Sequence, residues 1–121
     1  MGISTQERNK QRVREIFERV VNGGDVDAAA EYYREDYIQH NPHVPQGREA
    51  LKNLIRAMHA SGDPMQAEIK LINAEDDRVW LLLEWSGGSA PAGIPRLEQT
   101  AEIFRIEDGM MAEHWDVLQF G

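Results

Sequence analysis

Three ionisable side chains near the end of the sequence have the types and spacing that proton transfer requires. Asp116 lies among the apolar residues Trp115, Val117 and Leu118. A carboxylate with such neighbours is poorly hydrated, which is the setting that general acid–base catalysis uses. Asp116 is therefore the first candidate for a catalytic residue, and a salt-bridged aspartate at a sheet edge is an equally supported alternative.

Glu102 and His114 are predicted to face each other on neighbouring strands. The prediction rests on a hairpin with the three-residue loop Glu107-Asp108-Gly109, in which a final glycine takes the left-handed conformation. A histidine beside a carboxylate is held in one tautomer and can relay a proton, whereas the simpler interpretation is an ion pair. A two-residue loop would bring Trp115 opposite Glu102 and turn Asp116 to the other face.

A loop after a short predicted strand offers further polar groups. His40 and Asn41 stand where alternating residues give way to a proline-rich stretch. The asparagine amide can donate to and accept from a ligand oxygen or a water. The commoner meaning of an Asn-Pro pair is a turn, here with an exposed histidine, and His43 is expected in solvent.

The same side chains could be metal ligands, as a mixed set of His40, Glu102, His114 and Asp116. The short spacing of an H-E-x-x-H motif is missing, however, and the sequence has no cysteine. Neither a nucleophilic-serine elbow nor a lysine-bearing phosphate loop is present. We therefore predict no metal and no other cofactor.

The elements that must position these groups run from helices to strands. Ser4 and Glu7 match a capping box, and apolar residues at helical spacing follow. From Met65 onward the apolar period becomes two. Helices are expected at about 4–21, 25–34 and 47–61, and strands at 37–40, 65–74, 78–86 and on both sides of 107–109. This order predicts an α+β fold, with a pocket enclosed between the helices and one face of a bent sheet, in one domain of residues 1–121.

Composition limits the partners. The 121 residues include 13 Lys and Arg against 21 Asp and Glu, a net charge of −8. This acidic balance argues against nucleic acid or an anionic membrane as a partner. No apolar run could span a bilayer, and the first residues do not resemble a signal peptide, so a cytoplasmic protein is expected. The sheet's second face, with Met111, Trp115 and Val117, is expected to be a homodimer surface or, alternatively, a scatter of exposed apolar residues.

Three segments carry a resemblance to a known family: VNGGDVDAAAEYYREDYIQHNP, GREALKNLI and EIFRIEDGMMAEHWDVLQ. With them the chain resembles the SnoaL-like polyketide cyclases of the nuclear transport factor 2-like superfamily. The resemblance implies a cone-shaped α+β barrel, in which a curved sheet of four to six strands wraps around a long N-terminal helix and commonly forms a dimer. It also implies that Asp116 is the acid/base of an intramolecular aldol closure and that Asn41 lies at the pocket mouth. Thr100 and Glu102 stand where those cyclases have glutamine and histidine.

Together these arguments predict an enzyme acting on a small, largely apolar carbonyl compound. Asp116 would move the proton, with His114 and Glu102 as its partners and with Asn41 and His40 beside the substrate. The expected substrate-binding wall comprises Thr100, Phe17, Tyr33, Phe104, Leu118 and Phe120. Two alternatives remain: a binding protein without turnover, and activation of a water by Asp116 and Asn41 as in limonene epoxide hydrolases, whose bridging arginine falls at Thr100.

Overall fold

The computed structural model describes residues 3–90 and 95–121. Its helices are α1 (Thr5–Ile16), α2 (Ala29–Tyr32) and α3 (Arg48–His59), with a π-helical turn η1 (Phe17–Val21) and a 3₁₀ turn η2 (Val26–Ala28). Its strands are β1 (Tyr33–Gln39), β2 (Gln66–Glu75), β3 (Arg78–Ser86), β4 (Leu97–Glu107) and β5 (Met110–Phe120). The predicted α+β class is confirmed.

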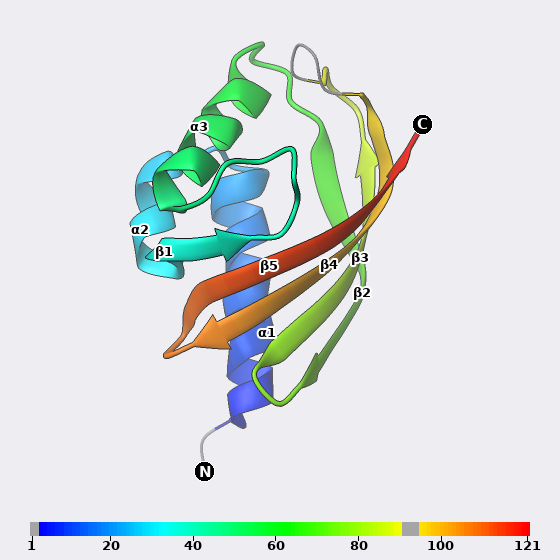
Figure 1. Cartoon of the computed structure of the whole chain (residues 1–121). Coiled ribbons are helices and arrows are strands. Elements are labelled where there is room, and N and C mark those ends of the chain that lie inside the picture. Colours follow the sequence, from blue (N-terminus) through cyan, green and yellow to red (C-terminus); the bar gives the residue numbers. More distant parts are fainter. Residues whose placement is uncertain (1–2, 91–94) are drawn as a thin grey trace.

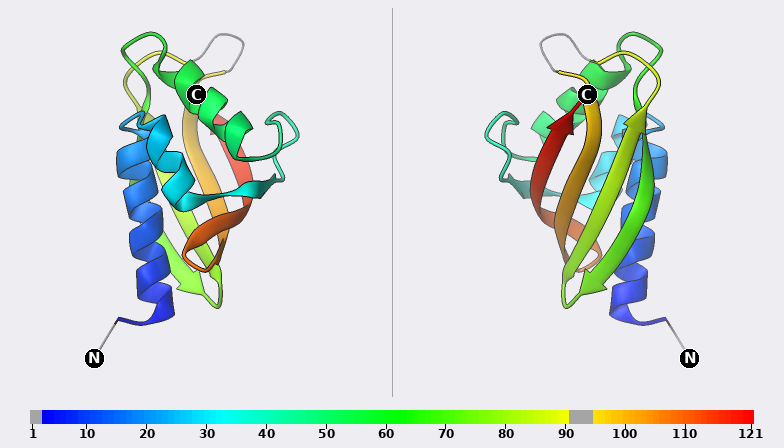
Figure 2. Two further views of the ribbon diagram at one scale, coloured as in Figure 1. Left: turned by 90° about the vertical axis from the view of Figure 1, so that its left-hand side faces the viewer. Right: turned by 90° about the vertical axis from the view of Figure 1, so that its right-hand side faces the viewer.

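The five strands form one curved sheet in the order β1-β5-β4-β3-β2. β1 runs parallel to β5, and all other neighbours are antiparallel. The helices lie against the concave face, and none of the described helices lies on the opposite face (Figures 1 and 2). None of the helices in the described parts of the chain has the length and apolar content that crossing a bilayer requires.

The first helix follows its sequence signals closely. Ser4 caps it, because the Ser4 hydroxyl accepts a hydrogen bond from the Glu7 backbone N–H at 3.1 Å. Its buried face continues into η1, where the Asn22 N–H bonds to the Phe17 carbonyl, five residues back, at 2.8 Å. The helix thereby lies along the sheet and presents Phe17 to the interior of the molecule.

The second helix is shorter than predicted, and the first strand is longer. Asp25 caps the helical segment as expected, accepting from the Ala28 N–H at 3.2 Å. The helix stops at Tyr32, and Tyr33 is already extended and paired with Met111 of β5. Aromatic residues suit a strand, and pairing with β5 overrides the helical spacing that continued to Arg34.

The last hairpin differs from the prediction in its turn. Glu107 pairs with Met110, so the loop is the two residues Asp108 and Gly109, with φ of 51° and 77°. Positive φ at both positions defines the type I′ turn, which Asp-Gly favours because its twist matches the strands. The predicted three-residue loop is therefore wrong.

A β-bulge in β5 then restores the orientation of the functional side chains. Ile106 pairs with Met111 but Arg105 pairs with Glu113, which leaves Ala112 as an extra residue. The next pairs are Phe104 with His114, Glu102 with Asp116 and Thr100 with Leu118. Glu102 thus faces Asp116 and not His114 as predicted, yet all six side chains share the concave face.

The bulge also corrects the prediction for Met111. This side chain was expected on the outer face, but it is fully buried in the core. Trp115 and Val117 do lie on the outer face, opposite Ile103 and Ala101, and Val117 is 72% exposed.

Candidate active site

A cavity of about 580 Å³ lies between the helices and the concave face of the sheet. Most of its wall is aromatic or aliphatic, and the polar groups lie on β1, β4, β5 and the loop after β1. Such an apolar pocket with a few convergent polar groups is typical of small-molecule sites. The polar lining residues are Tyr33, Tyr37, Gln39, Asn41, His43, Thr100, Glu102, His114 and Asp116, together with the Trp85 indole.

The His114 ring is held in a stack of aromatic side chains. Phe104 lies at 4.5 Å between ring centroids and 15° between ring planes, and Tyr37 at 6.4 Å and 20°. Both ring nitrogens of His114 have partners: Nδ1 lies 2.9 Å from Gln39 Oε1, and Nε2 lies 2.8 Å from Glu102 Oε1. All of these groups are buried, so the imidazole has one orientation.

Gln39 determines which nitrogen of His114 carries hydrogen. The Gln39 amide oxygen also accepts from the Asn41 backbone N–H at 3.1 Å, and its amide nitrogen donates to the Tyr37 hydroxyl at 3.3 Å. These contacts assign the oxygen of Gln39 to the side of His114, so Nδ1 is the donor there. The Gln39 backbone is itself clamped, because its N–H and carbonyl both bond to the Gln46 side chain.

Glu102 shares a proton with His114 at the centre of the sheet. Burial raises the pKa of the Glu102 carboxyl, and this effect outweighs the hydrogen bond from His114, which lowers it. Asp116 on the opposite strand raises the Glu102 pKa further. Next to Glu102, the Thr100 hydroxyl accepts a hydrogen bond from the Trp85 indole at 3.0 Å, which orients that ring at the cavity wall.

Asp116 contacts the loop after β1. The Asn41 amide nitrogen donates to Asp116 Oδ2 at 3.3 Å, and the Asn41 amide oxygen accepts from the His43 N–H at 2.9 Å. The second contact assigns the Asn41 amide orientation, so its NH₂ group faces the carboxylate. Asp116 is partly exposed, which leaves its carboxylate accessible from the cavity.

Burial also raises the pKa of the two tyrosines in the wall. Desolvation is the main cause for Tyr33 and Tyr37, and the charge of Glu102 adds to it in both cases. Both phenols therefore remain protonated over the physiological range. Since Tyr37 accepts its hydrogen bond from Gln39, its own O–H remains as a donor.

The structure brings together nearly all of the predicted site residues. The cavity wall includes Asp116, His114, Glu102, Asn41, Thr100, Phe17, Tyr33, Phe104, Leu118 and Phe120. His40 is separate: its ring stacks on Trp115 at 4.8 Å and its Nε2 lies 2.6 Å from Glu113 Oε2. His40 is therefore not among the residues that line the cavity. His43, expected in solvent, is exposed but also belongs to the cavity wall.

Sequence reasoning missed three residues that shape the site: Tyr37, Gln39 and Trp85. The signal for the first two was present, because alternation in a strand places Tyr37 and Gln39 on the same face. Trp85 belongs to the alternating run of β3, but its contact with Thr100 depends on the pairing of β3 with β4.

Glu102, His114 and Asp116 are also the residues that could hold a metal ion. Their nearest ligand atoms lie within 4.8 Å of one another. Ligands around a tetrahedral ion stand about 3.4 Å apart, so this set would have to contract. Because His114 Nε2 and Glu102 Oε1 are joined by a hydrogen bond, the cluster is arranged for proton sharing.

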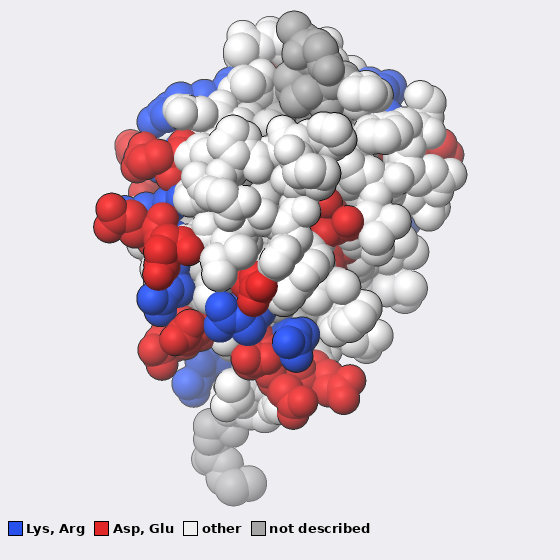
Figure 3. Space-filling view, viewed as in Figure 1, with Lys and Arg blue, Asp and Glu red and all other residues white. Residues whose placement is uncertain are grey.

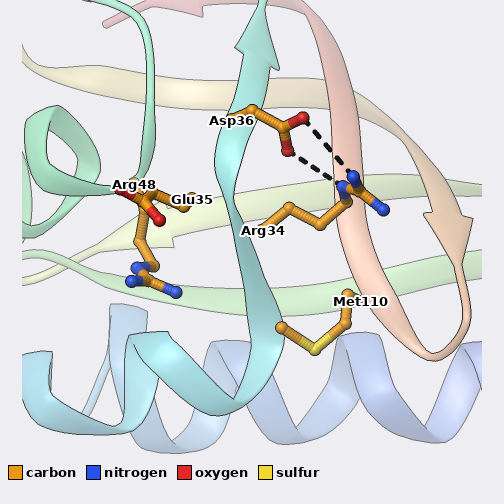
Figure 4. A pocket seen from close by; sticks show the side chains of 5 residues that line it. All are labelled: Arg34, Glu35, Asp36, Arg48 and Met110. Atoms are coloured by element: carbon orange, nitrogen blue, oxygen red, sulfur yellow. Dashed lines mark hydrogen bonds and ion pairs between the residues drawn. The ribbon is translucent and has the colours of Figure 1, made fainter.

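A second hollow, of about 650 Å³, is open to solvent beside β1 (Figure 4). It is lined by Arg34, Glu35, Asp36, Arg48 and Met110. Arg34 turns to Asp36, with a hydrogen bond of 2.9 Å from Nε to Oδ1. Because this arginine is already paired with a carboxylate and the hollow is open to solvent, the hollow is a weaker candidate for a ligand-binding site than the enclosed cavity.

Comparison with solved structures supports the same architecture. TsrD from Streptomyces laurentii is 25% identical, with a TM-score of 0.77 over 98% of this chain and 92% of that one. An epoxide hydrolase of M. tuberculosis, described as LEH-like, is 17% identical, with a TM-score of 0.75 over 96% and 86%. A provisionally named SnoaL-like polyketide cyclase from Jannaschia sp. is 18% identical, with a TM-score of 0.72 over 98% and 91%. The last two likenesses show the fold alone.

Comparison by sequence gives the family. No curated protein sequence matches the chain. The family model described as the SnoaL-like domain matches residues 13–114, which include the end of α1, all of α2 and α3, and most of the sheet. The predicted resemblance is thereby confirmed, and the chain belongs to the SnoaL-like domain family.

Proposed function

We propose that the chain is a cofactor-independent enzyme that moves a proton at a carbon next to the carbonyl of a small, largely apolar compound. The observation that carries the proposal is the contact of Asp116 with Asn41 at the wall of an apolar cavity, beside the buried Glu102–His114 pair. A carboxylate base and a proton held nearby are the two groups that such a reaction requires.

In the first step, the Asp116 carboxylate takes the proton from the α-carbon, the electron pair of that C–H bond forms the C=C bond of an enolate, and the π pair of the carbonyl moves to its oxygen. The Asn41 NH₂ group holds the carboxylate in place. As negative charge develops on the substrate oxygen, the Tyr37 O–H donates a hydrogen bond to it, and protonated Glu102 exchanges its hydrogen bond to His114 for one to this oxygen.

Two outcomes can follow from the enolate. Where the substrate has a C=C bond next to the reacting carbon, return of the proton from Asp116 to the far carbon of the conjugated enolate gives an isomer of the substrate. Attack of the enolate carbon on a second carbonyl in the same molecule forms a carbon–carbon bond, and the resulting alkoxide takes the proton from Asp116. Both outcomes leave Asp116 ionised again and need no co-reactant.

Exchange of α-protons for deuterium tests the proton transfer without knowledge of the natural substrate. We expect the protein to accelerate the exchange of α-tetralone in D₂O, followed by proton NMR. Asp116→Asn should lower the protein-dependent rate by about 10²- to 10⁴-fold, the usual contribution of a general base. Asp27→Asn, at an exposed position outside the cavity wall, is the matched control. Equal rates for Asp116→Asn and the wild type would eliminate the mechanism.

Activation of water is a second candidate, favoured by the same Asn41–Asp116 contact. Asparagine and aspartate together can hold a water and take its proton as it attacks an epoxide. The residue at the position of the bridging arginine is Thr100, which is buried and bonded to Trp85. Glu102 would then have to supply the proton for the opened oxygen. Incorporation of ¹⁸O from labelled water into a diol would favour this reaction, whereas deuterium at carbon favours the first.

We also propose that two copies of the chain associate through the outer face of the sheet. One row of apolar side chains crosses four paired strands, from Leu71 through Leu82 and Ala101 to Val117. Trp80 and Ile103 extend it on one side. Leu71 and Val117 are 62% and 72% exposed, and such a continuous apolar surface is typical of an interface.

A further inference from the structure

The charged groups in the cavity wall are unevenly distributed. Two carboxylates, Glu102 and Asp116, belong to it, together with the imidazoles of His43 and His114. Within the described parts of the chain, the wall includes no lysine and no arginine. On the face that Figure 3 shows, uncharged side chains predominate in the middle and upper part, with a few acidic groups among them, while mixed acidic and basic side chains gather along the left and lower margins.

The Glu102–His114 pair contributes no net charge. Since His114 Nδ1 is a donor to Gln39, one proton remains between Nε2 and Glu102 Oε1, which are 2.8 Å apart. If Glu102 holds this proton, both side chains are neutral, and if Nε2 holds it, an imidazolium faces a carboxylate. Both forms sum to zero, so the pair neither attracts nor repels an ionic ligand strongly.

Asp116 is then the group that determines the sign of the net charge in the cavity wall. Its partner Asn41 is a neutral amide, which orients the carboxylate without neutralising it. The arginines of the adjoining strands are engaged elsewhere: Arg105 Nε donates to Glu113 Oε1 at 2.8 Å, and Arg34 bonds to Asp36. A carboxylate or phosphate in the cavity would therefore meet an acidic group with no lysine or arginine of the described wall to offset it, in an apolar environment that strengthens repulsion.

We propose that the cavity selects ligands by charge: it binds neutral or singly cationic molecules and excludes carboxylates and phosphates. This inference deepens the proposed function, on which it rests for the choice of the site. It narrows the substrate to a neutral carbonyl compound or an amine-bearing one. Acids of the same skeleton are excluded as substrates or products.

Four probes with one skeleton test the selection: α-tetralone, α-tetralol, α-aminotetralin and tetralin-α-carboxylic acid. Their affinities at neutral pH can be read from the change in tryptophan fluorescence, since Trp85 belongs to the cavity wall, and checked by calorimetry. We expect the ketone, alcohol and amine to bind at least about tenfold more tightly than the acid, which corresponds to about 1.4 kcal/mol. Equal binding of the acid and the alcohol would overturn the proposal.

Two variants assign the effect to Asp116. Asp116→Asn keeps the size of the side chain and removes its charge, so the acid should gain affinity and the amine should lose it. Asp27→Asn removes the same formal charge from an exposed position and should leave the order unchanged. If Asp116→Asn binds the four probes in the same order of affinity as the wild type, Asp116 is not the group that selects by charge.

The test separates this inference from the proposed function. Selection by charge without deuterium exchange would refute the enzyme and keep the inference, leaving a binding protein. If α-tetralone exchanges its α-protons but the acid binds as tightly as the alcohol, the enzyme proposal stands and the selection by charge is refuted.

Discussion

The contacts of His114 hold its imidazole in one orientation. The rings of Tyr37 and Phe104 stack with it, and each of its nitrogens lies within hydrogen-bond distance of an oxygen atom. Of these contacts, the one with Gln39 decides the position of the hydrogen, because the Gln39 amide is itself oriented by a backbone N–H. The proton available for chemistry is thereby placed on the Glu102 side of the ring.

Replacing Gln39 should therefore change the tautomer of His114. In Gln39→Leu, Nδ1 loses its acceptor and is expected to release its hydrogen to solvent, so that the proton shared with Glu102 remains on Nε2 and the Glu102 carboxylate accepts from it. Gln39→Glu retains an acceptor oxygen and should keep Nδ1 protonated. Nitrogen-15 NMR of the imidazole, with no ligand present, distinguishes the two tautomers. An unchanged His114 signal in Gln39→Leu would show that Gln39 has only a packing role.

Glu102 predicts a dependence of stability on pH. Its raised pKa means that the folded state binds the proton more tightly than the unfolded chain, so the stability it contributes is present at low pH and is lost as pH rises through the folded pKa. Glu102→Gln carries no such proton and can still donate to His114 Nε2. We expect the variant to gain stability over the wild type as pH rises from about 4.3, the ordinary glutamate value, toward neutrality.

Thermal unfolding of both proteins across this pH range provides the measurement. The two curves should differ least at the acidic end, where the wild-type carboxyl is neutral. A Glu102→Gln variant that loses stability relative to the wild type toward neutral pH would show instead that an ionised Glu102 stabilises the fold.

At the scale of elements, the turn and the bulge of the last hairpin decide which side chains the cavity receives. The two-residue turn alone would direct His114 and Asp116 to the outer face, and the extra residue Ala112 reverses this. The orientation of the functional groups thus depends on two compensating local features of one hairpin.

The turn can be tested through Gly109. A methyl group there would have only the Arg12 side chain within 4 Å, at 3.9 Å, so space is available. The φ of 77° is nevertheless costly for any residue with a Cβ, and Gly109→Ala should lower the free energy of unfolding by about 1–2 kcal/mol. Asp108→Asn, which keeps a residue that tolerates positive φ, should be nearly neutral in the same denaturant titration.

The same hairpin shows which parts of the fold and the site can be predicted from the sequence. Alternation predicted the strands, and the concave-face set of Glu102, His114 and Asp116 was predicted correctly. The opposing pairs were wrong by two residues, because turn type and bulge combine and alternation detects neither of them. Gln39 was missed for a different reason: its partner is 75 residues away, and no local pattern joins β1 to β5.

For the whole molecule, the bare outer face is the main feature beyond the cavity (Figure 2). If two copies associate there, Val117→Glu should place a charge from each copy in the apolar contact and convert a dimer to a monomer, measured by light scattering during size-exclusion chromatography. Ala57→Glu, on an exposed position of α3, is the control and should not change the mass. A wild-type protein that is monomeric at micromolar concentration would end the dimer proposal.

The pairing of β1 with β5 has a consequence for the order of folding. The groups of the candidate active site come from two parts of the chain that are 75 residues apart, as in the contacts of Asn41 with Asp116 and Gln39 with His114. Local hairpins close before contacts of such separation, because closing a long loop costs more entropy. During synthesis, therefore, the helices and the β2–β3 hairpin can form early, while the proton-sharing groups meet only after β5 has been made and has docked beside β1.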